Sequence, residues 1–224
     1  QRQAQAISLT LASGLIAALA GPELFKLTRD FGPVPFAGAY AAIAGLGLLG
    51  TLPVLSLRGM GRPNAAPPPA MPLAKALAIP GIRPAILAAT VSQGLMVLLM
   101  APAPLAMTAV GCSPDQAAAA IRWHVLAMFA PGLITGSLIR RFGTRAVLQA
   151  GMALLFAAGV AAVAGQTVGW FNLSLILLGI GWNFGFVGAT HMLQASAPAD
   201  ARASVQGAND TLVASASAIG ALGS

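Results

Sequence analysis

The chain has 224 residues, of which 57% are hydrophobic and 8% are charged, with 12 Lys and Arg residues against five Asp and Glu residues. A soluble protein of ordinary composition carries about a quarter charged residues, so this chain cannot cover a water-exposed surface with polar groups. The composition predicts an integral membrane protein. The basic residues are too few and too scattered for a surface that binds nucleic acid.

Long segments without Asp, Glu, Lys or Arg place the membrane-spanning helices. A spanning helix needs about 20 apolar residues, and backbone groups in lipid must be hydrogen-bonded within the protein. The turn-like sequence from Gly165 to Gly169 divides the uncharged window 146–199 into two helices. We therefore expect an all-α membrane protein with about seven transmembrane helices, over residues 4–24, 35–57, 84–108, 116–139, 146–165, 170–194 and 204–224.

The first predicted helix carries Gly14 and Gly21, which are seven residues apart and share a face that suits close helix packing. Pro22 is expected to kink or end this helix. After the second helix, the proline-rich segment 58–83 is expected to be an extended loop, with one short amphipathic turn from Leu73 to Ile79 on the membrane surface. This loop leaves two predicted helices before it and five after it.

The distribution of basic residues over the connections predicts the orientation in the membrane. One side carries nine of them, namely Arg2, Arg58, Arg62, Lys75, Arg83, Arg140, Arg141, Arg145 and Arg202. The other side carries Lys26, Arg29 and Arg122. Because cytoplasmic loops are enriched in Lys and Arg, the N-terminal end and the 58–83 loop are predicted to be cytoplasmic, and the C-terminal end to lie outside.

Polar side chains inside predicted spans are the functional candidates, because each is costly in lipid unless it is paired or hydrated. Asp210 is the sharpest of them, about 14 Å along the last helix, and Gln206 shares its face while Asn209 precedes it directly. No other acid or base lies on that helix beyond Arg202, so reversible protonation of Asp210 is one hypothesis. A structural pairing with an arginine of another helix is the equally weighted alternative.

The helix at 116–139 contains two further candidates. The residues Ser113 to Gln116 match a capping box with proline in the first turn, which predicts the start of the helix here. His124 then lies about 15 Å along the helix, near the middle of the membrane. Arg122 and His124 point to different faces, so we expect Arg122 to reach outward, and His124 is a candidate for lining a polar path through the membrane.

Other candidates lie on the helices 84–108 and 170–194. Gln93 is a possible cavity residue, and Trp182 and Asn183 are candidates for contact with the ring of a bound molecule. The small residues Gly181 and Gly185 beside them favour close packing as the alternative reading of that segment. His191, near the end of the same helix, is expected at the interface between membrane and water.

The segment from Gly136 to Arg145 joins two helices through a short, triply basic turn. We expect Gly136 to let a neighbouring backbone approach, Gly143 to permit the turn, and Thr144 to cap the next helix. Arg140, Arg141 and Arg145 can interact with helix-terminal carbonyl groups or with a carboxylate elsewhere. An ordinary positive-inside turn accounts for the same charges.

This segment resembles the Gly-x-Leu-x-Asp-Arg-x-Gly-Arg-Lys signature of the major facilitator superfamily, with Arg140 and Thr144 in place of an acidic and a basic residue. The Gly14, Gly21 and Pro22 pattern is similar, in reduced form, to a glycine-proline motif in helix 5 of its antiporters. The resemblance implies a truncated twelve-helix bundle. Residues 1–57 would then be helices 5–6, residues 58–83 the central loop, and residues 84–224 helices 7–11, with helices 1–4 and 12 missing.

The resemblance implies a secondary transporter in a bacterial inner membrane that moves a small organic solute by alternating access, with protons as a possible coupling ion and a monomer as the full-length form. A seven-helix receptor is the alternative, and the only lysines, Lys26 and Lys75, exclude a retinal pump. We find no metal-binding, nucleotide-binding or enzymatic motif. Cys112 has no partner for a disulfide, and no cofactor is expected.

Overall fold

The computed structural model describes residues 14, 16, 17, 19–21, 23–32, 34–55 and 71–224, and the regular elements within them are helices. The chain forms two compact units, one of residues 16–68 and a larger one that contains residues 69–224 together with Gly14. In the smaller unit the described positions between 16 and 28 are helical, and α2 (Ala37–Leu55) follows. The helices predicted at 4–24 and 35–57 are therefore confirmed where the chain is described.

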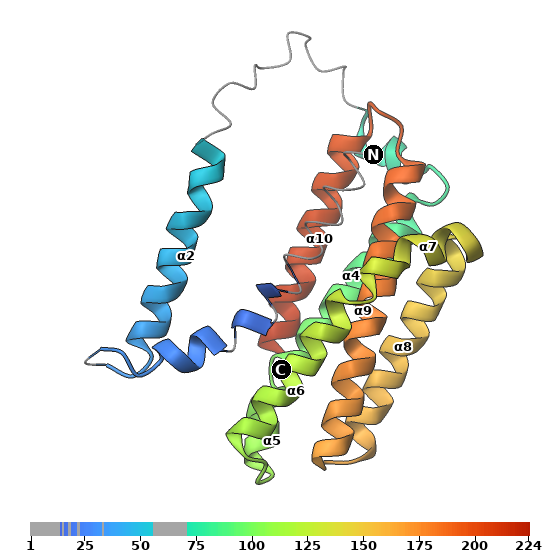
Figure 1. Cartoon of the computed structure of the whole chain (residues 1–224). Coiled ribbons are helices and arrows are strands. Elements are labelled where there is room, and N and C mark those ends of the chain that lie inside the picture. Colours follow the sequence, from blue (N-terminus) through green and yellow to red (C-terminus); the bar gives the residue numbers. More distant parts are fainter. Residues whose placement is uncertain (1–13, 15, 18, 22, 33, 56–70) are drawn as a thin grey trace. The chain divides into compact units, whose positions relative to one another are not determined.

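The larger unit is a helical bundle (Figure 1). Its helices are α3 (Leu73–Leu77), α4 (Ile82–Met100), α5 (Ala103–Ala109), α6 (Pro114–Phe129), α7 (Gly132–Phe142), α8 (Thr144–Ala164), α9 (Val168–Ser196) and α10 (Arg202–Leu222). Each predicted helix after the 58–83 segment has a counterpart among them. The break predicted near Gly165 separates α8 from α9.

Two predicted helices are each split in the structure. The segment 84–108 is divided at Ala101 and Pro102 into α4 and α5, and 116–139 is divided at Ala130 and Pro131 into α6 and α7. The second pair is bent by 40°. Proline lacks the N–H group of an interior helix residue and clashes with the preceding turn, so the prediction of one continuous helix over 116–139 is wrong at this point.

Three helical segments in the described part of the chain are long and apolar enough to cross a bilayer, namely Ile82–Ala109, Thr144–Ala164 and Val168–Ser196. The bent pair α6 and α7 would make a fourth. In α2 the apolar stretch Ala37–Pro53 is shorter. The 21 residues of α10 include Gln206, Asn209 and Asp210, which lower its hydropathy.

The proline-rich segment ends in a helix that packs against the bundle. Residues 56–70 of the predicted loop lie outside the described residues, but α3 confirms the short helical turn predicted from Leu73. Ala76 of α3 is fully buried in a cluster with Ile82 and Val205, and the N–H of Met71 donates to the carbonyl of Asp200 at 3.0 Å. The turn is therefore anchored on α4 and α10.

Helix α9 is the centre of the larger unit, and it packs against α4, α6 and α8. Glycines permit this, as predicted for Gly181 and Gly185. A Cβ atom on Gly181 would lie 2.9 Å from the backbone nitrogen of Leu155, and one on Gly151 would lie 2.8 Å from the Cα atom of Gly185. The backbones of α8 and α9 thus touch where side chains would separate them.

Candidate functional site

Two amide side chains of α10, those of Gln206 and Asn209, are hydrogen-bonded to Asp210. The Nε2 atom of Gln206 donates to Oδ1 of Asp210 at 2.7 Å, and Nδ2 of Asn209 donates to the same oxygen at 3.2 Å. Gln206 and Asp210 are exposed in the described unit, while Asn209 is buried. The structure therefore brings together the three residues that the sequence pattern places on this helix, since residues four apart share a helix face.

Gln206 also lines a cavity of about 670 Å³ between the end of α9 and the beginning of α10. The polar side chains in its lining are His191, Gln194, Arg202 and Gln206. Arg202 donates from Nε to the carbonyl of Ala197 at 3.3 Å. None of the described residues that line the cavity is acidic, and Arg202 and the two glutamines present positive charge and hydrogen-bond donors to a bound group. Asp210 lies one helical turn beyond Gln206.

Gln93 of α4 and Trp182 of α9 form a second hydrogen-bonded pair of side chains. The indole Nε1 of Trp182 donates to Oε1 of Gln93 at 2.9 Å, and its ring stacks on Phe186 with centroids 5.1 Å apart and an interplanar angle of 10°. This bond orients the Gln93 amide, and its Nε2 makes no hydrogen bond to the described residues. Both residues are half-buried, so this pair presents the aromatic surface of Trp182 and the hydrogen-bond donor Nε2 of Gln93 side by side.

Asn183 and His124 lie inside the bundle. Asn183 is 2% exposed, and both ends of its amide are hydrogen-bonded to α6 and α7. His124 is 1% exposed, and its Nδ1 lies 2.8 Å from the carbonyl oxygen of Leu175 on α9. Arg122 is half-buried. The structure does not join these residues to Asp210, which lies on α10.

The helix start before His124 is as predicted. Oγ of Ser113 accepts from the N–H of Gln116 at 3.2 Å, and the Gln116 side chain accepts from the N–H of Ser113 at 2.8 Å. Both halves of the capping box are therefore present, with Pro114 in the first turn.

The basic turn differs in part from its prediction. Gly143 has φ 85° and ψ 154°, a conformation that is essentially limited to glycine, so its predicted role in the turn is confirmed. Gly143 itself, and not Thr144, is the N-cap of α8, and the Thr144 hydroxyl instead lies 3.1 Å from Nδ1 of His191. Among the described residues, an added Cβ on Gly136 would meet the Arg140 guanidinium at 3.9 Å and no backbone atom of another helix, so the close approach predicted for Gly136 is not found there.

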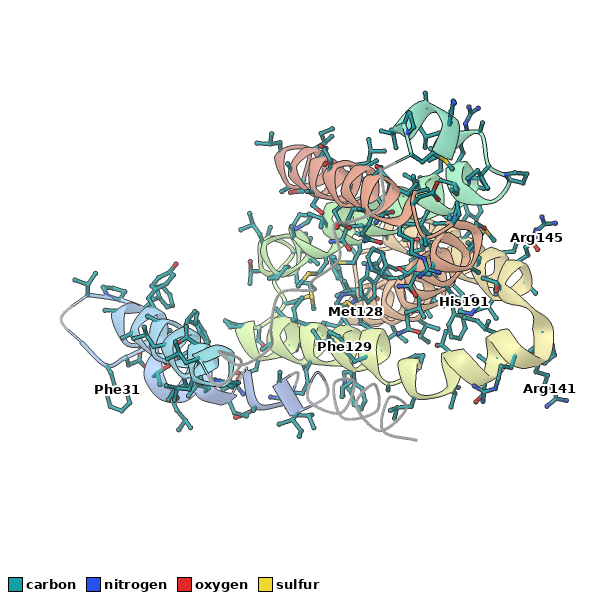
Figure 2. The ribbon with its side chains drawn as sticks, turned by 90° about the horizontal axis from the view of Figure 1, so that it is seen from above. Phe31, Met128, Phe129, Arg141, Arg145 and His191 are labelled. Atoms are coloured by element: carbon teal, nitrogen blue, oxygen red, sulfur yellow. The ribbon has the colours of Figure 1, made fainter. Side chains whose placement is uncertain are left out.

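The arginines of this turn make local contacts. Arg140 donates to Oγ of Ser137 at 2.8 Å, and the guanidinium of Arg141 lies 5.2 Å from the ring centroid of Phe142. Figure 2 shows Arg141 and Arg145 at the edge of the bundle, pointing away from it. Within the described residues none of the three pairs with a carboxylate, because the ion pairs there are Glu23–Lys26 and Asp30–Arg29.

The glycines of the first predicted helix are described, but Pro22 lies outside the described residues. A Cβ on Gly14 would lie 3.1 Å from the ring of Phe129, whereas one on Gly21 would meet nothing within 4 Å. Two residues that contact the candidates were not predicted: Thr135 lies 2.6 Å from Oδ1 of Asn183, and Phe186 stacks on Trp182. The sequence did contain a signal for Thr135. Its hydroxyl follows Pro131 by four residues, and a threonine hydroxyl in a helix can bond the carbonyl group four residues before it.

Apolar helices of spanning length that carry amide side chains in their interior define a multi-pass helical membrane protein. The family model described as Major Facilitator Superfamily matches residues 1–221. The chain therefore belongs to the major facilitator superfamily, as its basic turn predicted.

Among curated proteins, the chain is similar to the riboflavin transporter RfnT of Brucella anthropi, with 44% identity over 217 residues, 94% of this chain and 54% of that protein. It is also similar to two uncharacterized MFS-type transporters of Bacillus subtilis. These are YdeG, 32% identical over 238 residues, and YddS, 30% identical over 240 residues, each covering 98% of this chain and 55% of the relative. The chain spans about half the length of these relatives. No solved structure matches it significantly.

Proposed function

We propose that the full-length protein is a secondary transporter that moves a small organic solute across a bacterial inner membrane by alternating access. Family membership over residues 1–221 and 44% identity with a riboflavin transporter support this function. In this proposal α2 is helix 6 of the family and α4 to α10 contribute to helices 7–11. The basic turn between α7 and α8 then faces the cytoplasm, because cytoplasmic connections are enriched in arginine.

The solute that we propose is riboflavin or a close flavin relative, and the observation that carries this is the identity with RfnT. A flavin has a planar aromatic ring system with carbonyl and N–H groups at its edge and a polyhydroxyl chain. The stacked Trp182 and Phe186 rings can contact such a plane, and the Nε2 group of Gln93 can donate to a ring carbonyl. Donors of the cavity beside Gln206 can bind the hydroxyl groups.

We also propose that Asp210 couples transport to protons. Its Oδ1 atom accepts from both Gln206 and Asn209, while Oδ2 accepts no hydrogen bond from the described residues. A carboxylate with one restrained oxygen and one open oxygen can take up a proton without losing its position. Asp210 lies one helical turn from the cavity beside Gln206, so it would be exposed to water whenever that cavity opens to solvent.

The test is uptake of labelled riboflavin into bacterial cells that lack their own riboflavin uptake and express the full-length protein. We expect uptake above the empty-vector level, reduced by a protonophore. Asp210→Asn should abolish the dependence on external pH, whereas Asp200→Asn, a matched loss of a carboxylate in the α9–α10 turn, should preserve it.

The outcomes separate the three parts of the proposal. Uptake of another solute from a panel, without riboflavin uptake, would refute the flavin assignment and retain the transporter. An unchanged pH dependence in Asp210→Asn would remove Asp210 from coupling. No uptake of any solute by well-expressed protein would contradict the transport function itself.

A further inference from the structure

The joint between α6 and α7 leaves backbone groups without their usual helix partners. In a continuous helix, the carbonyl of Ala127 would accept from the N–H of residue 131, and that of Met128 from the N–H of Gly132. Residue 131 is proline and has no N–H group, and the chain bends by 40° here. Polar backbone groups buried in a membrane protein need substitute partners.

One side chain of α9 supplies such a partner for α6 and also contacts α7 on the other side of the joint. Nδ2 of Asn183 donates to the carbonyl of Met128 at 2.8 Å. On the other side, the Thr135 hydroxyl lies 2.6 Å from Oδ1 of Asn183 and 2.8 Å from the carbonyl oxygen of Pro131. Met128 and Phe129 at the end of α6 are labelled in Figure 2. Thr135 is fully buried, so water does not replace these bonds.

A glycine one turn earlier on α9 brings this asparagine into reach. A Cβ on Gly179 would lie 2.6 Å from the carbonyl oxygen of His124 and 2.9 Å from the nitrogen of Met128. The backbones of α6 and α9 therefore touch at this level, and Gly179 and Asn183, four residues apart, face the same neighbour. The short asparagine side chain spans the remaining gap at the joint.

We infer that Asn183 is a positioning residue: it supplies the donor that the Met128 carbonyl loses at the bend, accepts from Thr135 of α7, and so fixes the bend between α6 and α7 onto α9. The three helices then move as one body, and the Asn183 amide is committed to the protein rather than to a solute. The inference concerns the joint itself, so it does not rest on the proposed function or on the identity of the solute.

The first test measures thermal unfolding of the purified full-length protein in detergent. Asn183→Leu keeps the branching of the side chain at Cγ and removes both hydrogen bonds, so it should lower Tm by more than the same enlargement does at a control position. Asn172→Leu is the matched control on the same helix, because Oδ1 of Asn172 is buried without a partner among the described residues. A fall in Tm for Asn172→Leu as large as that for Asn183→Leu would overturn the inference.

The second test distinguishes hydrogen bonding across the joint from simple packing. Pro131→Ala restores the N–H group that bonds the Ala127 carbonyl and removes the ring that forces the bend, so the N–H of Gly132 can reach the carbonyl of Met128. The fall in Tm caused by Asn183→Leu should therefore be at least halved in the Pro131→Ala background. Additive effects of the two changes would contradict the role assigned to Asn183.

A milder pair of variants keeps the inference testable where Asn183→Leu does not fold. Thr135→Val preserves the volume of the side chain but removes its hydroxyl, whereas Thr135→Ser preserves the hydroxyl and removes a methyl group. Hydrogen bonding at the joint predicts a lower Tm for Thr135→Val than for Thr135→Ser. The reverse order would show that packing alone decides this position and would overturn the inference.

Discussion

The contact between α8 and α9 predicts a large effect of adding one methyl group. In Gly151→Ala the new Cβ would collide with the backbone nitrogen of Gly185 and lie 2.8 Å from its Cα atom and 2.9 Å from the carbonyl oxygen of Gly181. All three are backbone atoms, so no side chain can rotate away. Restoring ordinary contacts of about 3.5–4.0 Å between carbon atoms requires the helices to separate by roughly 1 Å.

The magnitude follows from two opposing effects. Alanine is a better helix former than glycine by about 1 kcal/mol, whereas overpacking a closely packed interface costs about 1–3 kcal/mol. The separation also weakens contacts along the rest of the seam, because a gap of about 0.5–1 Å loses a quarter to a half of the attraction of each contact. We expect a net destabilisation of about 1–2 kcal/mol, seen as a fall in Tm of about 2–6 °C.

The assay is thermal unfolding of the full-length protein in detergent, followed by tryptophan fluorescence. Gly159→Ala is the matched control on the same helix, because a Cβ there meets nothing within 4 Å. It should leave Tm unchanged or raise it. Equal stability of Gly151→Ala and Gly159→Ala would refute the conclusion that the backbone contact between α8 and α9 stabilises this bundle.

Three further substitutions test other parts of the structure. Trp182→Phe keeps an aromatic ring but removes the donor to Gln93. If the proposed riboflavin transport is correct, the KM for uptake should rise several-fold with expression unchanged, and an unaltered KM would separate this pair from solute binding. Ser113→Ala removes the capping-box acceptor of α6 and should cost about 0.5–2 kcal/mol in thermal unfolding, whereas Ser113→Asp should retain most of the stability. Gly143→Ala forces a side chain into a positive-φ conformation and should cost about 1–3 kcal/mol, while a cost near zero would show that the turn rearranges freely.

Local chemistry accounts for the features that the sequence predicted correctly. The helices, the break near Gly165, the capping box at Ser113 and the glycine turn at Gly143 each depend on residues close together in the chain. The prediction failed where a local signal was overlooked or ambiguous. Pro131 breaks a helix that was expected to be continuous, and Gly143 occupies the capping position assigned to Thr144.

The candidate site could be predicted only in part. The spacing of Gln206 and Asp210 predicts a shared face, and the structure joins them by a hydrogen bond. Nothing in the spacing indicates that Gln206 also lines a cavity with His191 and Arg202, because those residues meet only where the end of α9 approaches the start of α10. The partners of Trp182 lie one turn along its own helix and on α4, 89 residues away in the sequence.

The sequence by itself determined the class of protein, since 57% hydrophobic and 8% charged residues are compatible with lipid and not with a water-exposed surface. It also determined which polar residues stand inside the helices. Only the tertiary structure decided which neighbours each of them contacts. Helix periodicity relates residues of one helix to each other, but the rotation of a helix against its neighbours is set by packing. That packing turns Asn183 toward the α6–α7 joint and leaves Trp182, its immediate neighbour, bonded to Gln93.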